Sequence, residues 1–162
     1  MHQSSYVEMQ KFFIKYVQTS YKYKDSILDI GSYDVNGTYK NLIPTNCLYT
    51  GLDIVNGPNV DTVASSLYSY PFPDNKFDFV ISGQCMEHVQ DLHRWIQEVV
   101  RVTSPNGYIC LIAPSSWEEH RHPIDCWRIL PDGMKFLFNL AGIKEIEIYN
   151  KTPDCVGIGR KI

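Results

Sequence analysis

Three histidines have neighbours that could make them chemically active. His88 directly follows an acid, Glu87, and His120 and His122 form a His-x-His pair with Asp125 shortly after it. A neutral imidazole can take a proton from a hydroxyl group near pH 7. We therefore take His88, His120 and His122 as candidate catalytic residues, although a histidine beside an acid can equally be structural.

The segment around the His-x-His pair is open to three interpretations. It could contact a substrate, with one histidine as general base, or it could be a lid whose histidines are solvated. A His-x-His pair with a carboxylate could also bind a metal ion, but the segment offers no closed ligand set, and we assign no metal ligand. We favour substrate contact. The predicted substrate-binding residues are Arg121, Asp125, Trp127 and Arg128, with the arginines suited to an anionic group.

Two further acids stand in short apolar runs. Asp29 lies in residues 26–30, ahead of Gly31 and a polar loop, and Asp53 ends a second run about twenty residues later. Glycine after the first strand of a parallel sheet lets the backbone approach a nucleotide-like ligand. An acid at the end of the second strand can bind ribose hydroxyls. The pattern predicts an adenosine-containing cofactor.

The elements that must position these groups follow from hydrophobic periodicity and turn residues. The expected strands are residues 26–30, 48–53, 60–63, 77–82, 108–113 and 143–149, with a seventh at 155–162 at an edge of the sheet. The expected helices are residues 5–19, opened by a Ser5-x-x-Glu8 capping box, a short one at 37–42, one capped by Asp91, and one from Pro131 to Gly142. Alternating strands and helices predict an α/β fold, with a mostly parallel sheet covered on both faces.

Composition narrows the class of protein. The 162 residues are predicted to form one domain, and a net charge of −3 without a basic run disfavours nucleic-acid partners. The start lacks a signal-peptide pattern, and no apolar run approaches the ~20 residues of a membrane span. Five widely spaced cysteines without a C-x-x-C pair suit a reducing compartment, so we expect a cytoplasmic protein. The oligomeric state stays open, a homodimer included.

Four motifs, in this order, resemble class I S-adenosylmethionine-dependent methyltransferases of the type 11 group. They are ILDIGS at 27–32, YTGLD at 49–53, PFPDNKFDFVIS at 71–82 followed by MEHV at 86–89, and EVVRVTSPNG at 98–107. The later stretch HRHPIDCWRILPDG at 120–133 resembles a subgroup that often accompanies glycan biosynthesis.

The resemblance implies a Rossmann-like, doubly wound sheet of seven mostly parallel strands with helices on both faces. It implies S-adenosylmethionine as cofactor and methyl transfer to a hydroxyl or amine of a small molecule, with a sugar or glycan precursor among the candidates. The alternative is a non-catalytic S-adenosylmethionine-binding module or partner subunit. A nicotinamide dehydrogenase is weaker, because a full G-x-G-x-x-G is absent.

The resemblance also assigns roles to single residues. Gly31 would let the backbone approach the methionine portion, Asp29 would position its amino group, and Asp53 would accept both ribose hydroxyls. Two features depart from the family pattern, since Tyr33 and Val35 replace glycines of the loop and Ser66 replaces a frequent acid. The predicted cofactor-binding residues are Asp29, Gly31, Ser32, Tyr33, Asp53, Ile54, Ser66, Leu67, Ser82, Gly83 and Gln84.

Overall fold

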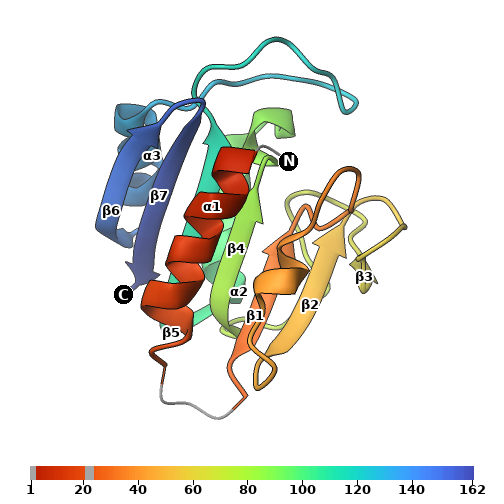
Figure 1. Cartoon of the computed structure of the whole chain (residues 1–162), viewed down its shortest axis with the longest axis vertical. Helices are drawn as coiled ribbons and strands as arrows, with labels where there is room; N and C mark the ends of the chain where they lie inside the picture. The colour runs from red at the N-terminus through yellow and green to blue at the C-terminus, as the bar shows by residue number, and fades with distance from the viewer. Residues whose placement is uncertain (1–2, 21–23) are drawn as a thin grey trace.

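A seven-stranded sheet with the order β3-β2-β1-β4-β5-β7-β6 organises the molecule. The computed structural model describes residues 3–20 and 24–162 (Figure 1). Strands β3, β2, β1, β4 and β5 are each parallel to their neighbours in this group. Strand β7 is antiparallel to both of its neighbours, β5 and β6. The strands are β1 Ser26–Ile30, β2 Leu48–Asp53, β3 Thr62–Val63, β4 Phe77–Gly83, β5 Thr103–Pro114, β6 Ile143–Lys151 and β7 Asp154–Lys161.

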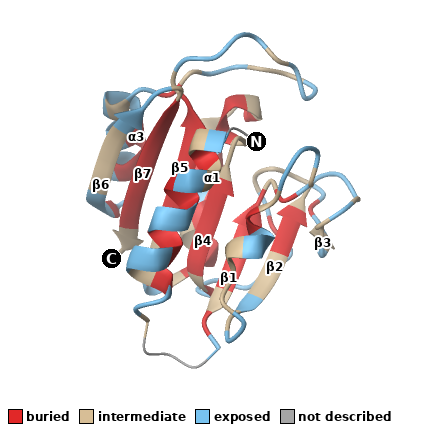
Figure 2. Ribbon diagram, viewed as in Figure 1, coloured by how far each residue is buried: buried red, intermediate tan, exposed pale blue. Residues whose placement is uncertain are grey.

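Helices cover both faces of the sheet, as predicted (Figure 1). One face carries α1 (Gln3–Phe12), which continues as a π-helical turn η1 (Phe13–Val17), and the 3₁₀ helix η2 (Tyr39–Leu42). The other face carries α2 (Leu92–Val102) and α3 (Pro131–Leu140). Successive strand residues alternate between the two cores, which is why the central strands are largely buried (Figure 2).

The capping-box prediction for the first helix is wrong. Among the described residues the helix already includes Gln3, so Ser5 lies inside it and is buried. The Ser5 hydroxyl hydrogen-bonds the hydroxyl of Tyr39, and the buried Glu8 accepts a hydrogen bond from Tyr149. These two polar groups are therefore tied to distant parts of the chain, because tertiary partners compete with local capping.

The two helices of the opposite face form as predicted. Asp91 caps α2, its side chain accepting a hydrogen bond from the Arg94 N–H at 3.1 Å. Pro131 begins α3, and Gly142 follows it with φ +69°, in the left-handed region that favours glycine. Local signals specify both helices well.

Strand β7 was expected at an edge, and this is wrong. It lies between β5 and β6, and its first six residues are buried. Its glycines explain the position, because a Cβ on Gly157 would lie 2.6 Å from Cγ of Met134 in α3. Strand β7 has a glycine where α3 packs against it, so it fits in the interior of the sheet. Strand β6 forms the edge.

The segment between β5 and α3, residues 115–130, crosses the carboxyl ends of the parallel strands and is called the β5–α3 loop below (Figure 1). Much of it is exposed (Figure 2). The backbone N–H of Cys126 donates to the carbonyl of Glu87 at 2.7 Å, and the Trp127 indole N–H donates to the carbonyl of Val89 at 2.7 Å. The loop is thus attached to the 3₁₀ helix η3 (Met86–His88) and the residue after it.

No helix in the described ranges is long and apolar enough to cross a bilayer.

Candidate functional site

A cleft of about 1000 Å³ opens at the carboxyl ends of β1, β2 and β4. The strand order reverses at β1, since β2 lies on one side of it and β4 on the other. Ligands of open α/β sheets bind at this kind of reversal. The walls come from the loop after β1, the end of β2, the residues after β4, and part of the β5–α3 loop.

The loop after β1 forms the floor of the cleft. Gly31 has φ +81°, and a Cβ there would lie 2.9 Å from Cβ of Cys85, so only glycine fits. The side-chain amide of Asn59 donates to the carbonyl of Ser32 at 3.1 Å, which fixes the loop. Tyr33 packs against Gly57, where a Cβ would lie 1.8 Å from Cε2 of the ring. Tyr33 stands where the family pattern has a glycine, and its ring fits because residue 57 is a glycine.

Asp53 ends β2 and is held by backbone donors. Its Oδ1 accepts the N–H of Ile54 at 2.7 Å and of Val55 at 3.2 Å, and its Oδ2 accepts the N–H of Tyr33 at 3.1 Å. A carboxylate has about four acceptor positions. Oδ2 therefore keeps capacity for a hydroxyl donor in the cleft.

Asp29 lies in a different environment from Asp53. Its side chain is buried and accepts a hydrogen bond from the Tyr49 hydroxyl at 2.9 Å. Burial, with a smaller contribution from the nearby charge of Asp53, raises the pKa of Asp29 to about 7. This acid therefore carries only part of a negative charge near neutral pH.

The end of β4 completes this side of the cleft. A Cβ on Gly83 would lie 2.0 Å from the Tyr39 hydroxyl oxygen, so no side chain fits at position 83. The Gln84 side-chain N–H donates to Asp154 at 2.9 Å. Its Oε1 and the Oγ of Ser32 are buried, and neither has a hydrogen-bond partner among residues 3–20 and 24–162. Both residues line the cleft.

Two of the eleven predicted cofactor residues do not line the cleft. The Ser82 hydroxyl is buried and donates to the carbonyl of Ile30 at 2.8 Å. The Ser66 hydroxyl accepts the N–H of Tyr68 at 3.0 Å. Neither is among the lining residues, because both hydroxyls stabilise the protein's own turns and strands. The other nine are Asp29, Gly31, Ser32, Tyr33, Asp53, Ile54, Leu67, Gly83 and Gln84.

His88, His120 and His122 come together in the cleft and are called the histidine cluster. The ring centroid of His88 lies 5.1 Å from that of His120 and 5.8 Å from that of His122. The centroids of His120 and His122 are 6.1 Å apart. Burial lowers the pKa of His88, which favours its neutral form. The cluster follows β4 and β5, on the opposite side of β1 from Asp53.

Glu87 belongs to the same site, and the sequence alone assigns it no role. Its side chain is fully buried, and Nε2 of His88 and of His120 each lie 3.7 Å from its Oε1. Burial raises its pKa to about 7. The Glu87-His88 adjacency is visible in the sequence, but the approach of His120 depends on the path of the β5–α3 loop.

Asp125 and Arg128, predicted to bind substrate, instead hold the loop together. The guanidinium donates to both carboxylate oxygens, at 2.7 and 2.8 Å, and also to the carbonyls of Trp117, Glu118 and Trp127. The guanidinium keeps the pKa of Asp125 well below its usual range. The structure thus gives this pair a role within the loop, and neither residue lines the cleft.

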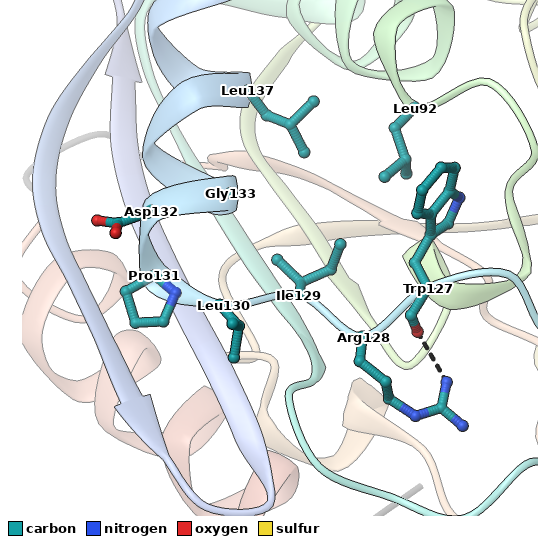
Figure 3. Close-up of a pocket in the computed structure, with 9 residues that line it drawn as sticks. All are labelled: Leu92, Trp127, Arg128, Ile129, Leu130, Pro131, Asp132, Gly133 and Leu137. Carbon is teal, nitrogen blue, oxygen red and sulfur yellow. Dashed lines mark hydrogen bonds between the residues drawn. The ribbon is translucent and has the colours of Figure 1, made fainter.

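Trp127 does not line the cleft either. It borders a second hollow of about 610 Å³ beside α3, where its ring lies next to Leu92 (Figure 3). Arg121 is the one predicted substrate residue that reaches the cleft. Its side chain is 73% exposed and pairs with Glu119 at 2.7 Å.

A family model described as a methyltransferase domain matches residues 28–111, slightly more than half of the chain. The chain belongs to the methyltransferase domain family. Its fold is that of the class I S-adenosylmethionine-dependent enzymes, since a solved S-adenosylmethionine-dependent methyltransferase from Aquifex aeolicus superposes with a TM-score of 0.71. That match covers 97% of this chain and 89% of the other at 16% identity.

Two curated relatives match over shorter stretches. An uncharacterized methyltransferase of Schizosaccharomyces pombe is 49% identical over 45 residues, which are 28% of this chain and 16% of that protein. A 2-methyl-6-phytyl-1,4-hydroquinone methyltransferase of Oryza sativa is 29% identical over 104 residues, 61% of this chain and 31% of that protein. The chain thus corresponds to less than a third of the length of either relative.

S-adenosylmethionine is the cofactor of this family, and the cleft fits it. Gly31 and Gly83 leave the floor free of side chains, and Asp53 keeps acceptor capacity for ribose hydroxyls. The Gln84 Oε1, which no other described residue hydrogen-bonds, is an acceptor of the kind that an ammonium group needs. The cofactor, when bound, supplies a methyl group already activated on a sulfonium.

Proposed function

We propose that this domain transfers a methyl group from S-adenosylmethionine to a hydroxyl or amine of a small molecule. One observation carries the proposal: a single cleft joins a glycine floor and Asp53 on one side of β1 to the histidine cluster on the other. A methyl donor and an acceptor held in one cleft can be aligned for direct displacement.

The residues on the Asp53 side would bind the cofactor. Asp53 would accept the ribose hydroxyls, and Ile54 and Leu67 would offer apolar contact to adenine. Asp29 and Gln84 would take the ammonium group, with Asp29 acting as an acceptor of partial charge. Binding along this wall would place the reactive end of the cofactor towards β4.

The histidine cluster would serve the acceptor. As the acceptor oxygen or nitrogen bonds to the methyl carbon, it must lose a proton, and a neutral imidazole is a suitable base. Proton transfer of this kind contributes typically ~10²–10⁴-fold to a rate. Arg121 at the rim would suit an acceptor with an anionic group, such as a phosphorylated sugar.

The finer assignment of the acceptor rests on two indications. The rice relative is named for a hydroquinone substrate, a small molecule. The stretch at residues 120–133 resembles a subgroup that accompanies glycan biosynthesis, which favours a sugar or glycan precursor.

Isothermal titration with S-adenosylmethionine and with its demethylated product tests the cofactor assignment. We expect both to bind, and Asp53→Ala to weaken binding by at least about tenfold, since charged hydrogen bonds contribute ~1.5–3 kcal/mol. Asp132→Ala, in the first turn of α3 and outside this cleft, is the matched control. No binding by the wild type would refute the proposal.

Methyl transfer is tested with labelled cofactor and a panel of sugar, phenol and amine acceptors. Cofactor binding without transfer, together with stable co-purification of another protein, would favour the non-catalytic alternative.

A further inference from the structure

The carboxyl group of Glu87 is buried beside two imidazoles. Its side chain is 0% exposed, and neither oxygen receives a hydrogen bond from another described residue. A buried carboxylate in this state is costly unless it is paired with a cation or shares a proton. The groups that face it are two imidazoles, with His88 Nε2 and His120 Nε2 each 3.7 Å from Oε1.

Both imidazoles are held so that Nε2 carries a lone pair. Nδ1 of His88 donates to the carbonyl of Ile124 at 2.5 Å. Nδ1 of His120 lies 3.2 Å from the carbonyl of Glu118 and 3.5 Å from Oδ2 of Asp125. With the proton on Nδ1, both Nε2 atoms face the carboxylate as electron donors. Histidines that bind metals are oriented in this way by a carbonyl or carboxylate at the other nitrogen.

The spacing of the three groups also suits a metal ion. One ligand atom from each of Glu87, His88 and His120 lies within 4.8 Å of the others. Nitrogen and oxygen ligands at ~2.0–2.2 Å from a tetrahedral ion would be ~3.4 Å apart, close to the two separations of 3.7 Å.

All three residues line the cleft, so an ion there would keep an open position. Structural zinc sites are closed by four protein ligands, whereas catalytic sites have three and leave a position for water or substrate. Two imidazoles and a carboxylate suit divalent first-row ions such as Zn²⁺, Mn²⁺ and Fe²⁺.

We propose that Glu87, His88 and His120 bind one divalent transition-metal ion. Its role rests on the proposed function: the open position binds the acceptor hydroxyl oxygen and lowers the pKa of that hydroxyl. The hydroxyl proton passes to His122, the member of the cluster outside the ligand set. The oxygen–methyl bond then forms as the carbon–sulfur bond breaks, and its electron pair stays on sulfur.

Cobalt binding tests the site on chelator-treated protein without a polyhistidine tag. We expect one Co²⁺ per chain, with a visible absorption spectrum typical of imidazole and carboxylate ligands, and displacement by Zn²⁺. Glu87→Gln and His120→Ala should each weaken Co²⁺ binding by more than about 100-fold, beyond the 10–100-fold cost of losing an outer partner.

The matched control is His93→Ala. His93 is exposed on α2 and contacts Gln97, so its loss should leave Co²⁺ affinity unchanged. Because Glu87 is buried, the fold of its variant is checked by circular dichroism, while His120 in the loop provides an independent test. Failure of the folded wild type to bind Co²⁺, or equal affinity in His120→Ala, would overturn the site.

The same preparation is titrated with S-adenosylmethionine to separate this site from the proposed function. Cofactor binding without Co²⁺ binding would overturn the metal site and leave the methyltransferase proposal standing. Co²⁺ binding without cofactor binding would support the ligand set and refute the proposed function.

Discussion

Two acids at the same cleft show how environment divides roles between identical side chains. Asp53 is half-buried and held by three backbone N–H groups, and its Oδ2 keeps capacity to accept a hydroxyl donor. Asp29 is buried, receives the Tyr49 hydroxyl, and has a pKa raised to about 7. Burial disfavours the charged form of an acid, and a nearby like charge adds to the effect.

The raised pKa of Asp29 predicts a pH-dependent stability. The folded protein holds the proton more tightly than the unfolded chain, whose pKa is near 3.8, so stability should fall as pH rises from about 4 to about 7. Asp29→Asn cannot ionise and should lack this contribution. The stability of the wild type relative to Asp29→Asn should fall by up to ~4 kcal/mol over this range. Urea unfolding at several pH values measures it, and parallel pH profiles would contradict the assignment.

At the scale of elements, the β5–α3 loop is ordered by its own ion pair. Arg128 donates to Asp125 and to three carbonyls, and Asp125 also accepts the N–H of His120 at 2.7 Å. The pair therefore holds the loop in the path that brings His120 next to Glu87. A guanidinium is suited to this, since its planar set of donors can reach a carboxylate and carbonyls together.

Replacing this guanidinium should loosen the loop without unfolding the sheet. Arg128→Lys keeps the charge but loses the paired hydrogen bonds, so we expect amide exchange across residues 116–128 to accelerate by at least about tenfold. Hydrogen exchange by mass spectrometry measures this, with α2 as the internal reference. Arg121→Lys is the control, because its exposed pair with Glu119 should contribute little. Equal exchange in both variants would show that the loop is ordered by other contacts.

The cap of α2 provides a second test at this scale. Asp91→Ala removes the side-chain acceptor of the Arg94 N–H and should lower the unfolding free energy by ~0.5–2 kcal/mol. Asp91→Asn keeps the acceptor and should recover most of the loss. If Ala and Asn were equally destabilising, the cap would not be the cause.

At the scale of the whole molecule, the placement of β7 joins the two halves of the core. Strand β7 contributes Val156 and Ile158 to the core under α1, while Gly157 gives room to Met134 and Phe138 of α3. Because branched residues alternate with glycines, β7 packs against α1 on one face and leaves room for α3 on the other.

Filling that space should destabilise the fold. Gly157→Ala would place a Cβ 2.6 Å from Cγ and 2.8 Å from Sδ of Met134, and overpacking of this kind costs ~1–3 kcal/mol. Gly133→Ala is the matched control, because nothing lies within 4 Å of its Cβ and alanine favours helix. Thermal unfolding should show a lower Tm for the first variant and an equal or higher one for the second. A neutral Gly157→Ala would contradict the tight packing of α3 on β7.

Local patterns in the sequence predict much of this protein. The alternation of strands and helices, the Asp91 cap, the Pro131 start and the glycine after β1 depend on interactions within a few residues, so periodicity and turn chemistry are sufficient to predict them. The motifs from residue 27 to residue 107 also identify the cofactor class, because the cofactor is bound by the ends of consecutive strands.

Tertiary structure alone decided the rest. Ser5 has a locally plausible capping role, but its hydroxyl is bound to Tyr39 in η2, and Arg128 reaches back across its loop to the carbonyls of Trp117 and Glu118. The interior position of β7 depends on space left for α3, and the approach of His120 to Glu87 depends on how residues 115–130 fold back over β4. These features arise from contacts between distant segments, and such contacts are set by packing, which no local pattern records.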